Sequence, residues 1–543
     1  MRVAQLMDRS LRWAVAMAAI ALVIVVALCA STWSGAFLSD DWSLVAHANR
    51  VLDEGRALAY LAGAFVQAEG LQTGFYRPVG LVSWVLSATH SGIDPPGWRA
   101  ANLFLHVLNG WLVLRLVRRI ADTPHAHTVA WLAAAAFWLY PLAPEASVWI
   151  AARFDQLALA GVLIACERHL ASRRMLDLPR VTSLFALAFA LGSKESAILG
   201  PALMFLCGLM VADERAPALG RVHATLHAVA RNLRDCVPAL ALLLAYFLLR
   251  LHLFGHVVQV YSVHTPLQVL DPAEILRRLA AMAPVLQQPF GVHALWLVGA
   301  ILVVLGIGAF TAARSGRWLR WWLLPGCASV LTVIALVVHF AGTESNGLGA
   351  RMLYATGAWL AIWLFLPFAG VRAGRTGLLC AAPLLIVFAV YLAISTNLWR
   401  EAGLAMRALL PVIVDTSHEL HARGEFGVVL IPDHLRTAAF ARNAQGGIGA
   451  GGIVPVNPHA GSIVMVVPFV PEVVDHFTAR GRIDFGNGRS LRTFCVDALP
   501  WTGEVRLVET PLGTPLTQPA AWWNEWSAAV AASACADDFP DLR

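Results

Sequence analysis

Charged residues are scarce in this chain of 543 residues, at 14% of the sequence. Soluble globular proteins contain about 25% charged residues, so the composition excludes an ordinary soluble protein. Disorder is excluded too, because 58% of the residues are hydrophobic and disordered chains contain few hydrophobic residues. Lysine is almost absent, since Lys194 is the one lysine among 40 basic residues and all the others are arginine.

Long apolar runs fill most of the first 400 residues, and the mean hydropathy is +0.65. A run of about 20 apolar residues can cross a bilayer as a helix. We expect the first run to be an uncleaved anchor, because cleavage would leave Asp40 and Asp41 near a loose new terminus. The sequence predicts an all-α polytopic membrane protein with about eleven spans, at residues 13–33, 98–117, 127–144, 155–169, 180–193, 196–212, 236–254, 291–313, 321–341, 352–370 and 377–395.

Arginines fall in alternate connections between these spans. The positive-inside rule makes those connections cytoplasmic. Within residues 1–400 they carry a net charge of +12, against −1 for the outer connections, and residues 401–543 carry −5. This asymmetry predicts a multi-pass protein of a bacterial inner membrane with its N-terminus inside and C-terminus outside, and no nucleic-acid partner. We expect a membrane domain at 1–396 and a mixed α/β periplasmic domain at 397–543, because β-like runs occur at 428–431 and 463–467.

Polar residues collect at the outer ends of the spans, where ionisable side chains are candidates for function. The first outer loop, residues 34–97, begins near the pair Asp40 and Asp41 and later contains Tyr76 and Arg77. Stretches at 44–61 and 81–86 are expected to lie as helices in the membrane interface. The later outer connections carry Glu145, Arg153, Asp155, Lys194, Glu195, Arg351 and Tyr354.

Carboxylates that lie opposite cations at one membrane face are suited to a reaction that transfers a group to a hydroxyl. A hydroxyl becomes a good nucleophile when a positioned carboxylate takes its proton. A lipid phosphate leaves readily when arginine or lysine meets its charge. The distribution of polar residues therefore favours a lipid-phosphate donor held at the outer membrane face.

Six motifs in order carry a resemblance to a known family. They are Asp40-Asp41, Tyr76-Arg77-Pro78, Asn102 to Asn109 with His106 between them, Tyr140-Pro141 to Glu145 followed by Trp149, Arg153 and Asp155, then Ser193-Lys194-Glu195, and Arg351 to Tyr354. Over about residues 13–400 this combination resembles the GT-C glycosyltransferases, and in particular the protein O-mannosyltransferases with tetratricopeptide repeats. The chain departs from that branch because no such repeats follow its last span.

The resemblance implies an inverting transferase that moves a sugar, mannose in this branch, from a polyprenyl phosphate to an extracytoplasmic hydroxyl of a protein, lipid or glycan. It implies that Asp40 and Asp41 form the catalytic base pair. The donor phosphate is expected to bind Lys194, Arg351, Arg77 and Arg153. The substrate pocket is expected to include Glu145, Asp155, Tyr76, His106, Asn102, Glu195 and Tyr354. The missing repeats leave the acceptor open.

Plainer roles exist for several of these residues. The aspartates can cap a helix that starts at Trp42. Lys194 can pair with Glu195 or extend to the interface, and Arg351 can anchor a span. Asn102, His106 and Asn109 share one helix face and can hydrogen-bond to neighbouring helices.

Other functions and ligands stay open at this point. A transporter or lipid flippase would show repeated halves and broken helices in the middle of the membrane, and a non-catalytic envelope-assembly subunit would not need its aspartates. No metal site or cofactor is predicted, although a divalent ion such as Mg²⁺ or Mn²⁺ can bind Asp40 or Asp41. Cys495 and Cys535 lie in the outer tail, where a disulfide between them is compatible with an oxidising periplasm.

Overall fold

The computed structural model describes residues 2–38, 41–67, 75–175, 177–211, 221–257, 272–281, 290–339, 350–370, 374–423, 426–431, 434–435, 438–439, 464–468, 491–496 and 507–510. The chain divides into two compact units. Unit 1 comprises Met1–Ala30, Arg56–Ser83 and Arg99–Thr396, and unit 2 comprises Ser31–Gly55, Trp84–Trp98 and Asn397–Arg543. The expected domains at 1–396 and 397–543 stay a prediction.

The described chain is predominantly helical. The α-helices are α1 (Arg2–Ala30), α2 (Asp41–Asp53), α3 (Ala57–Val66), α4 (Pro78–Ser91), α5 (Pro95–Ile120), α6 (Ala126–Trp138), α7 (Ala143–Val148), α8 (Arg153–Ala171), α9 (Leu178–Leu191), α10 (Gly200–Met210), α11 (Arg221–Phe254), α13 (Pro272–Ala281), α15 (Ala294–Arg314), α16 (Leu324–His339), α17 (Tyr354–Phe365) and α18 (Gly374–Arg423). Short helical segments of other types are η1 (Ile150–Ala152), η2 (Glu195–Leu199), η3 (Gly291–His293), η4 (Leu319–Leu323), η5 (Ala350–Leu353) and η6 (Leu366–Ala369).

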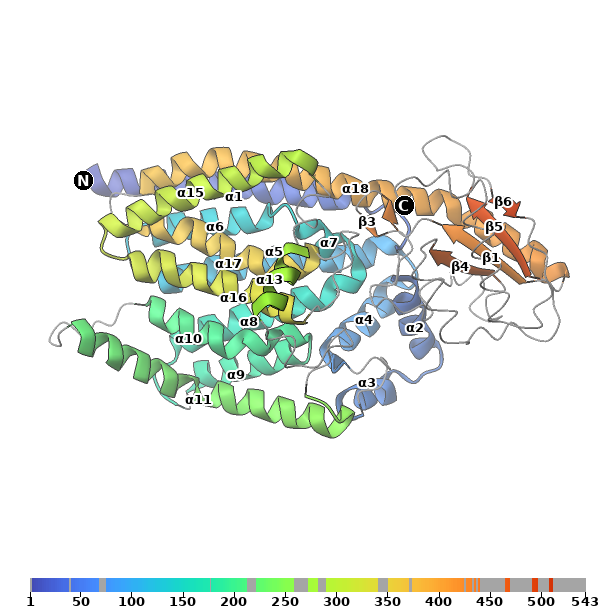
Figure 1. Ribbon diagram of the computed structural model, residues 1–543, viewed down its shortest axis with the longest axis horizontal. Coiled ribbons are helices and arrows are strands. Elements are labelled where there is room, and N and C mark those ends of the chain that lie inside the picture. The colour runs from blue at the N-terminus through green and yellow to red at the C-terminus, as the bar shows by residue number, and fades with distance from the viewer. Residues whose placement is uncertain are drawn as a thin grey trace. The chain divides into compact units, whose positions relative to one another are not determined.

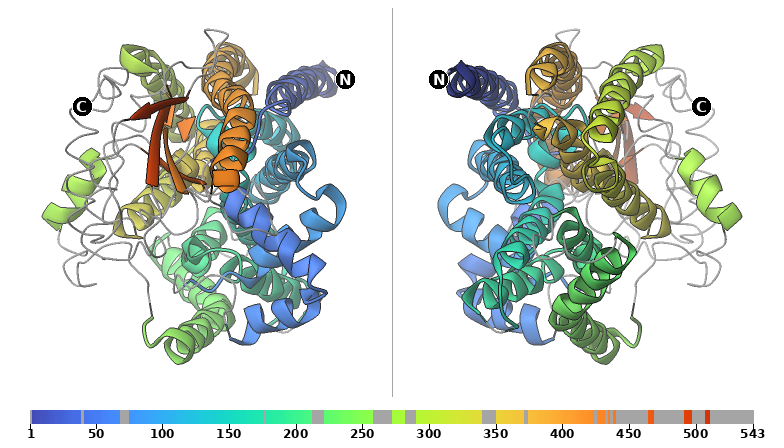
Figure 2. Two further views of the ribbon diagram at one scale, coloured as in Figure 1. Left: turned by 90° about the vertical axis from the view of Figure 1, so that its right-hand side faces the viewer. Right: turned by 90° about the vertical axis from the view of Figure 1, so that its left-hand side faces the viewer.

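Unit 1 is built from long helices packed side by side. α8 packs against α9 and α10, α6 packs against α1 and α17, and α16 packs against α17 (Figure 1). Figure 2 shows several of these helices nearly end-on. Small residues allow the closest approach: a Cβ atom on Gly161 of α8 would lie 2.7 Å from the main-chain oxygen of Ala186 in α9. Such small residues at helix contacts are typical of membrane bundles.

Six of the described helical segments are long and apolar enough to cross a membrane, namely Arg9–Ala30, Pro95–Ile120, Leu226–Phe254, Ala294–Arg314, Ala350–Ala369 and Thr376–Leu420. Helices also occupy the other expected spans, but they are shorter or more polar, such as Ala126–Trp138 and Leu178–Leu191. The expectation of a helical, polytopic membrane protein is therefore confirmed. The count of eleven spans stays a prediction.

The surface of unit 1 carries many large apolar side chains. Phe185, Trp296 and Leu379 are each about three-quarters exposed. Such residues occur on several different helices, and extended exposed apolar surface marks contact with a membrane or another protein. Lipid contact accounts for this surface, and the six long apolar helices agree with it.

The first outer loop, residues 34–97, contains the three helices α2, α3 and α4 and the start of α5. The expected helix at 44–61 is interrupted at Gly55, whose φ of 65° is in the left-handed region that favours glycine. In unit 2, the side-chain amide of Asn49 in α2 donates to the main-chain oxygens of Val45 and Gly92, at 2.8 and 3.0 Å. The indole of Trp98 donates to the same Gly92 oxygen at 3.0 Å. These bonds fix the segments of the loop that belong to unit 2.

Unit 2 also contains strands β1 (Phe426–Ile431), β4 (Val464–Pro468), β5 (Leu491–Val496) and β6 (Leu507–Thr510), and a small pair, β2 (His434–Leu435) and β3 (Ala438–Ala439). The sheet order is β4-β1-β5-β6, in which β1 is parallel to β4 and β5 while β6 is antiparallel to β5 (Figure 1). Strand β1 covers the expected run at 428–431, and β4 covers residues 464–467 of the other expected run. The mixed α/β domain as a whole stays a prediction, because much of 440–543 lies outside the described residues.

Candidate active site

Lys194 forms a buried ion pair with Asp155. The lysine follows the end of α9, and Asp155 lies in the first turn of α8. The lysine Nζ donates to both carboxylate oxygens, at 2.6 and 2.7 Å, and the side chains are 7% and 9% exposed. The alternative pairing of Lys194 with Glu195 is wrong. The backbone of Lys194 is extended, with φ of −159° and ψ of 148°, and consecutive side chains on an extended backbone point in opposite directions.

Glu195 instead faces two arginines. Arg77, at the start of α4, donates from Nε and Nη2 to the Oε2 atom of Glu195 at 3.0 and 2.7 Å. Arg250, near the end of α11, lies 3.5 Å from Oε1 and is 1% exposed. The guanidinium of Arg77 also stacks on Phe75, with 4.2 Å to the ring centroid. Sequence reasoning missed Arg250, although an arginine within an apolar helix is a recognisable signal of function.

Arg351 and Glu145 form a third buried pair. Arg351 lies in η5, directly before α17, and Glu145 lies in the first turn of α7. The carboxylate accepts from the Arg351 guanidinium at 3.1 Å and from its main-chain N–H at 3.2 Å. The guanidinium lies over Trp149, at 4.4 Å from the ring centroid. The two bonds and the ring contact fix this arginine in one orientation.

Arg153 is hydrogen-bonded to α4 and α5. Its Nε donates to the side-chain oxygen of Asn102 at 2.7 Å, and its Nη1 donates to the main-chain oxygen of Ser83 at 3.1 Å. The amide of Asn102 donates in turn to the main-chain oxygen of Trp149 at 3.0 Å. Gln156, which the sequence did not single out, donates to the main-chain oxygen of Asn102 at 3.0 Å.

The polar face of α5 joins several helices. The ring nitrogens of His106 lie 2.9 Å from the Tyr354 hydroxyl and 3.1 Å from the main-chain oxygen of Trp138. The amide of Asn109 donates to the Tyr354 hydroxyl at 3.3 Å and to the main-chain oxygen of Gln156 at 3.0 Å. The structure thus gives these side chains the interhelical hydrogen bonds that their shared helix face favours.

Eight residues of unit 1 make up what we call the buried charge cluster: Arg77, Glu145, Arg153, Asp155, Lys194, Glu195, Arg250 and Arg351. Burial lowers the pKa of Lys194 below its ordinary value of 10.5. Its contact with Asp155 raises the pKa, and the positive charges of Arg77 and Arg351 lower it again. Lys194, Arg77 and Arg351 therefore interact electrostatically.

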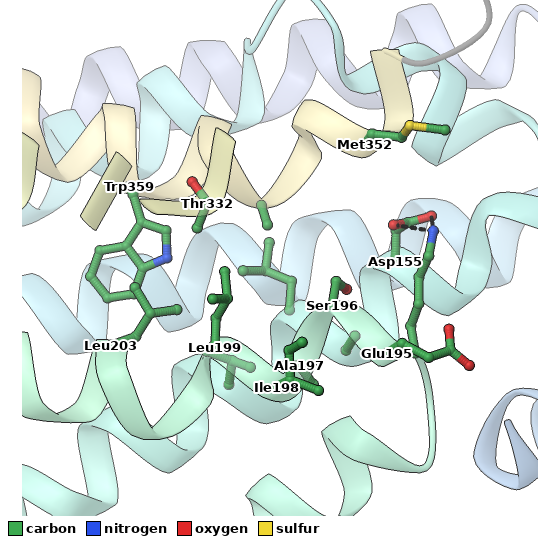
Figure 3. Close-up of a pocket in the computed structure, with 15 residues that line it drawn as sticks. Asp155, Glu195, Ser196, Ala197, Ile198, Leu199, Leu203, Thr332, Met352 and Trp359 are labelled. Carbon is green, nitrogen blue, oxygen red and sulfur yellow. Dashed lines mark hydrogen bonds and ion pairs between the residues drawn. The ribbon is translucent and has the colours of Figure 1, made fainter. Parts of the chain in front are cut away.

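A cavity of about 60 Å³ opens beside this cluster (Figure 3). Asp155 and its ion pair form the polar end, and Leu203 and Trp359 lie at the opposite end. Between them the lining is mainly apolar, as at Ile198 and Leu199, with the hydroxyls of Ser196 and Thr332 added. The cavity joins a charged end to mainly apolar walls, and its volume of about 60 Å³, below the roughly 300–1,000 Å³ of ordinary ligand pockets, accommodates only a small part of a ligand with a charged head and an apolar chain.

Besides Arg77, two expected site residues of the first outer loop can be described, and one cannot. Asp41 begins α2 and is 1% exposed, and its carboxylate accepts from the main-chain N–H of Leu38 at 3.4 Å. Leu38 precedes the helix, whereas a capping side chain accepts from N–H groups of the first turn, so the capping role and the catalytic role of Asp41 both stay predictions. The hydroxyl of Tyr76 donates to the main-chain oxygen of Phe65 at 2.9 Å, and burial raises the pKa of Tyr76. Asp40 lies outside the described residues.

The described part of the chain contains no group of three or more His, Cys, Asp or Glu side chains that could hold a metal ion. The expected ion ligand Asp40 is not among the described residues, so metal binding at the aspartates stays open. The same holds for the disulfide between Cys495 and Cys535, because Cys535 lies outside the described residues.

Comparison with known proteins gives a partial similarity. No family model matches the chain. A segment of 139 residues is 31% identical to the protein O-mannosyl-transferase Tmtc1 of Drosophila melanogaster. It spans 25% of this chain and 15% of the fly protein. The similarity supports a distant relationship to GT-C-like proteins, and together with the apolar helices it suggests a glycosyltransferase-like membrane protein.

Proposed function

We propose that this chain is an inverting glycosyltransferase that moves a sugar from a polyprenyl-phosphate donor to an extracytoplasmic hydroxyl of a protein, lipid or glycan. One observation carries the proposal. The buried pair of Lys194 and Asp155 closes the polar end of a cavity whose remaining walls are mainly apolar. A polyprenyl phosphate likewise has a charged phosphate group attached to an apolar chain.

The donor phosphate is proposed to bind at the polar end of this cavity. Lys194 acts there as a compact point charge, and the guanidinium of Arg351 or Arg77 acts as a planar fork. The carboxylates of Asp155, Glu145 and Glu195 keep these cations in place before the donor arrives. Preorganised cations of this kind stabilise developing negative charge without having to reorganise during the reaction.

Arg153, Asn102 and Tyr354 are proposed to shape the pocket rather than carry the phosphate. The Nε and Nη1 groups of Arg153 already donate to Asn102 and to the main chain. Tyr354 is hydrogen-bonded to two side chains of α5, His106 and Asn109. These bonds hold the side chains in fixed positions, which would favour a fixed position for a sugar bound against them.

The acceptor hydroxyl is proposed to lose its proton to Asp40 or Asp41. Its oxygen attacks the anomeric carbon of the donor sugar from the face opposite the phosphate. The bond between this carbon and the phosphate oxygen breaks, and the phosphate leaves on the lipid with the bonding electron pair. A single displacement of this kind inverts the anomeric configuration, and the cations beside the cavity stabilise the leaving phosphate.

The first donor sugar to test is mannose, because the fly protein with the partial similarity is named as an O-mannosyl-transferase. The asymmetry of basic residues supports a bacterial inner membrane, with the site and the C-terminal domain facing the periplasm. The apolar helices support multiple crossings of that membrane.

The proposal is tested with purified protein, polyprenyl phosphate carrying radiolabelled mannose, and an extract of the cell envelope. The parent is compared with Asp40→Ala, Asp41→Ala and Lys194→Ala. Arg173→Ala serves as the control, because it removes an exposed cation outside the buried charge cluster. We expect Lys194→Ala and at least one aspartate variant to lose transfer by about 100-fold, as when one transition-state contact is removed.

The other functions give different results in the same assay. A transporter or flippase binds the labelled lipid without forming a sugar product. A non-catalytic subunit gives no dependence of transfer on either aspartate. Transfer at the parental rate by all three site variants would contradict the proposed residues.

A further inference from the structure

A second cavity lies toward the far end of α5 from the buried charge cluster. Its volume is about 490 Å³, which lies within the usual range for ligand pockets, about 300–1,000 Å³. Arg115, Arg118 and Arg119 of α5 line it, together with His127 of α6. Between Asn102 and Arg118 the helix rises by about 24 Å at the standard rise per residue. This cavity is therefore separate from the one beside Lys194.

Two of its arginines are available to a ligand. Arg115 is already paired with Glu167 of α8, at 3.1 Å. Arg118 and Arg119 are exposed, and neither forms an ion pair or hydrogen bond with another described residue. Asp122 is the other acidic residue lining the cavity, and it is exposed. The cavity thus presents two guanidinium groups that can bind a phosphate in the planar, bidentate manner of arginine.

One wall of the cavity is aromatic. Trp111 lies one helical turn before Arg115, is 43% exposed, and has the Arg115 guanidinium 4.8 Å from its ring centroid. Tryptophan is enriched where lipid headgroups meet acyl chains, because its ring is apolar and its N–H is polar. A cationic wall beside an aromatic one at the end of a membrane helix fits a lipid better than a soluble anion.

We propose that this cavity binds the phosphate-bearing headgroup of an anionic phospholipid such as phosphatidylglycerol. Arg118 and Arg119 contact the phosphate, and Trp111 packs against the start of the acyl chains. The site is a lipid-binding site on the opposite membrane face from the proposed transfer site. It does not depend on the chain being a glycosyltransferase.

The experiment measures lipid binding to the purified full-length protein by native mass spectrometry. The probes are phosphatidylglycerol, phosphatidylcholine and inorganic phosphate. The parent is compared with the double variant Arg118→Gln/Arg119→Gln. The matched control is Arg173→Gln/Arg174→Gln, which removes the same charge from two exposed arginines that do not line the cavity. Unfolding temperatures in phosphatidylcholine check that all variants are folded.

We expect the parent to prefer phosphatidylglycerol to phosphatidylcholine. The cavity variant should bind phosphatidylglycerol about 30-fold more weakly, since each arginine near a membrane surface contributes about a fivefold effect on anionic lipid binding. The control pair should stay within about threefold of the parent. Arg118→Lys/Arg119→Lys should keep only part of the preference, because lysine retains the charge and lacks the bidentate geometry. Equal loss in the cavity and control variants would refute the site. Inorganic phosphate that displaces the lipid at equal concentration would show a general anion site instead.

Discussion

Substitutions of Lys194 and Asp155 can distinguish a structural role of this ion pair from a role in donor binding. Replacing Lys194 by methionine keeps an apolar stem and removes the charge. Asp155 then remains 9% exposed with no lysine beside it. Removing one partner of a buried ion pair costs about 3–5 kcal/mol, so Lys194→Met should lower the free energy of unfolding by about this amount.

A second substitution should restore stability without restoring transfer. Replacing both members of a buried pair by apolar residues is often neutral or stabilising, so Lys194→Met/Asp155→Leu should unfold close to the parent. Sugar transfer should stay about 100- to 1,000-fold below the parental rate, as when a contact to developing charge is lost. If the pair only holds helices together, transfer should recover along with stability.

Thermal unfolding and sugar transfer are measured on the same preparations. Arg234→Gln/Asp235→Asn is the control, because it removes an exposed ion pair of 3.5 Å outside the buried charge cluster. Lys194→Arg adds a test of residue type: stability should stay near parental, and transfer should fall about 100-fold as the charged group is displaced by about 1 Å. Transfer by the double variant within about threefold of the parent would refute the role of Lys194 in donor binding.

The remaining predictions address packing, charge and pH. Gly161→Ala should lower the free energy of unfolding by about 1–3 kcal/mol, because its Cβ would lie 2.7 Å from the main chain of α9. Gly306→Ala has open space around its Cβ, so its unfolding temperature should equal or slightly exceed that of the parent. Glu195→Gln should cost about 3–5 kcal/mol in denaturant unfolding, because two buried guanidinium groups lose their carboxylate; an unfolding free energy equal to that of the parent would contradict this reading. Because burial lowers the pKa of Lys194, transfer that needs its charge should fall as the pH rises, starting below the ordinary lysine value of 10.5. A transfer rate that stays constant up to pH 10.5 would argue against a charged Lys194 in the reaction.

The membrane character of the chain could be predicted because it depends on composition. Low charge and long apolar runs exclude a soluble fold whatever the tertiary contacts are. The number of crossings is harder to predict, because helices such as Ala126–Trp138 are short and depend on their neighbours for burial. The break at Gly55 was missed for a local reason. A positive φ at one glycine interrupts a helix whose apolar pattern continues on both sides.

The sequence singled out most residues of the buried charge cluster, but it did not predict how they pair. Lys194 was singled out because every other basic residue is arginine, and its neighbour Glu195 was the plain partner. The extended backbone at Lys194 turns the two side chains apart, so the lysine meets Asp155 and the glutamate meets Arg77 and Arg250. Such pairings join distant helices, and no spacing along the sequence specifies them.

The most direct test of the proposed function is the reaction itself. Purified protein is incubated with polyprenyl phosphate carrying radiolabelled mannose and with envelope extract, and the label in the acceptor fraction is compared with a reaction lacking the protein. We predict label in the acceptor fraction that depends on the protein and is lost in Lys194→Met/Asp155→Leu. Label that stays entirely on the lipid, with mannose and with every other donor sugar supplied, would contradict the proposal.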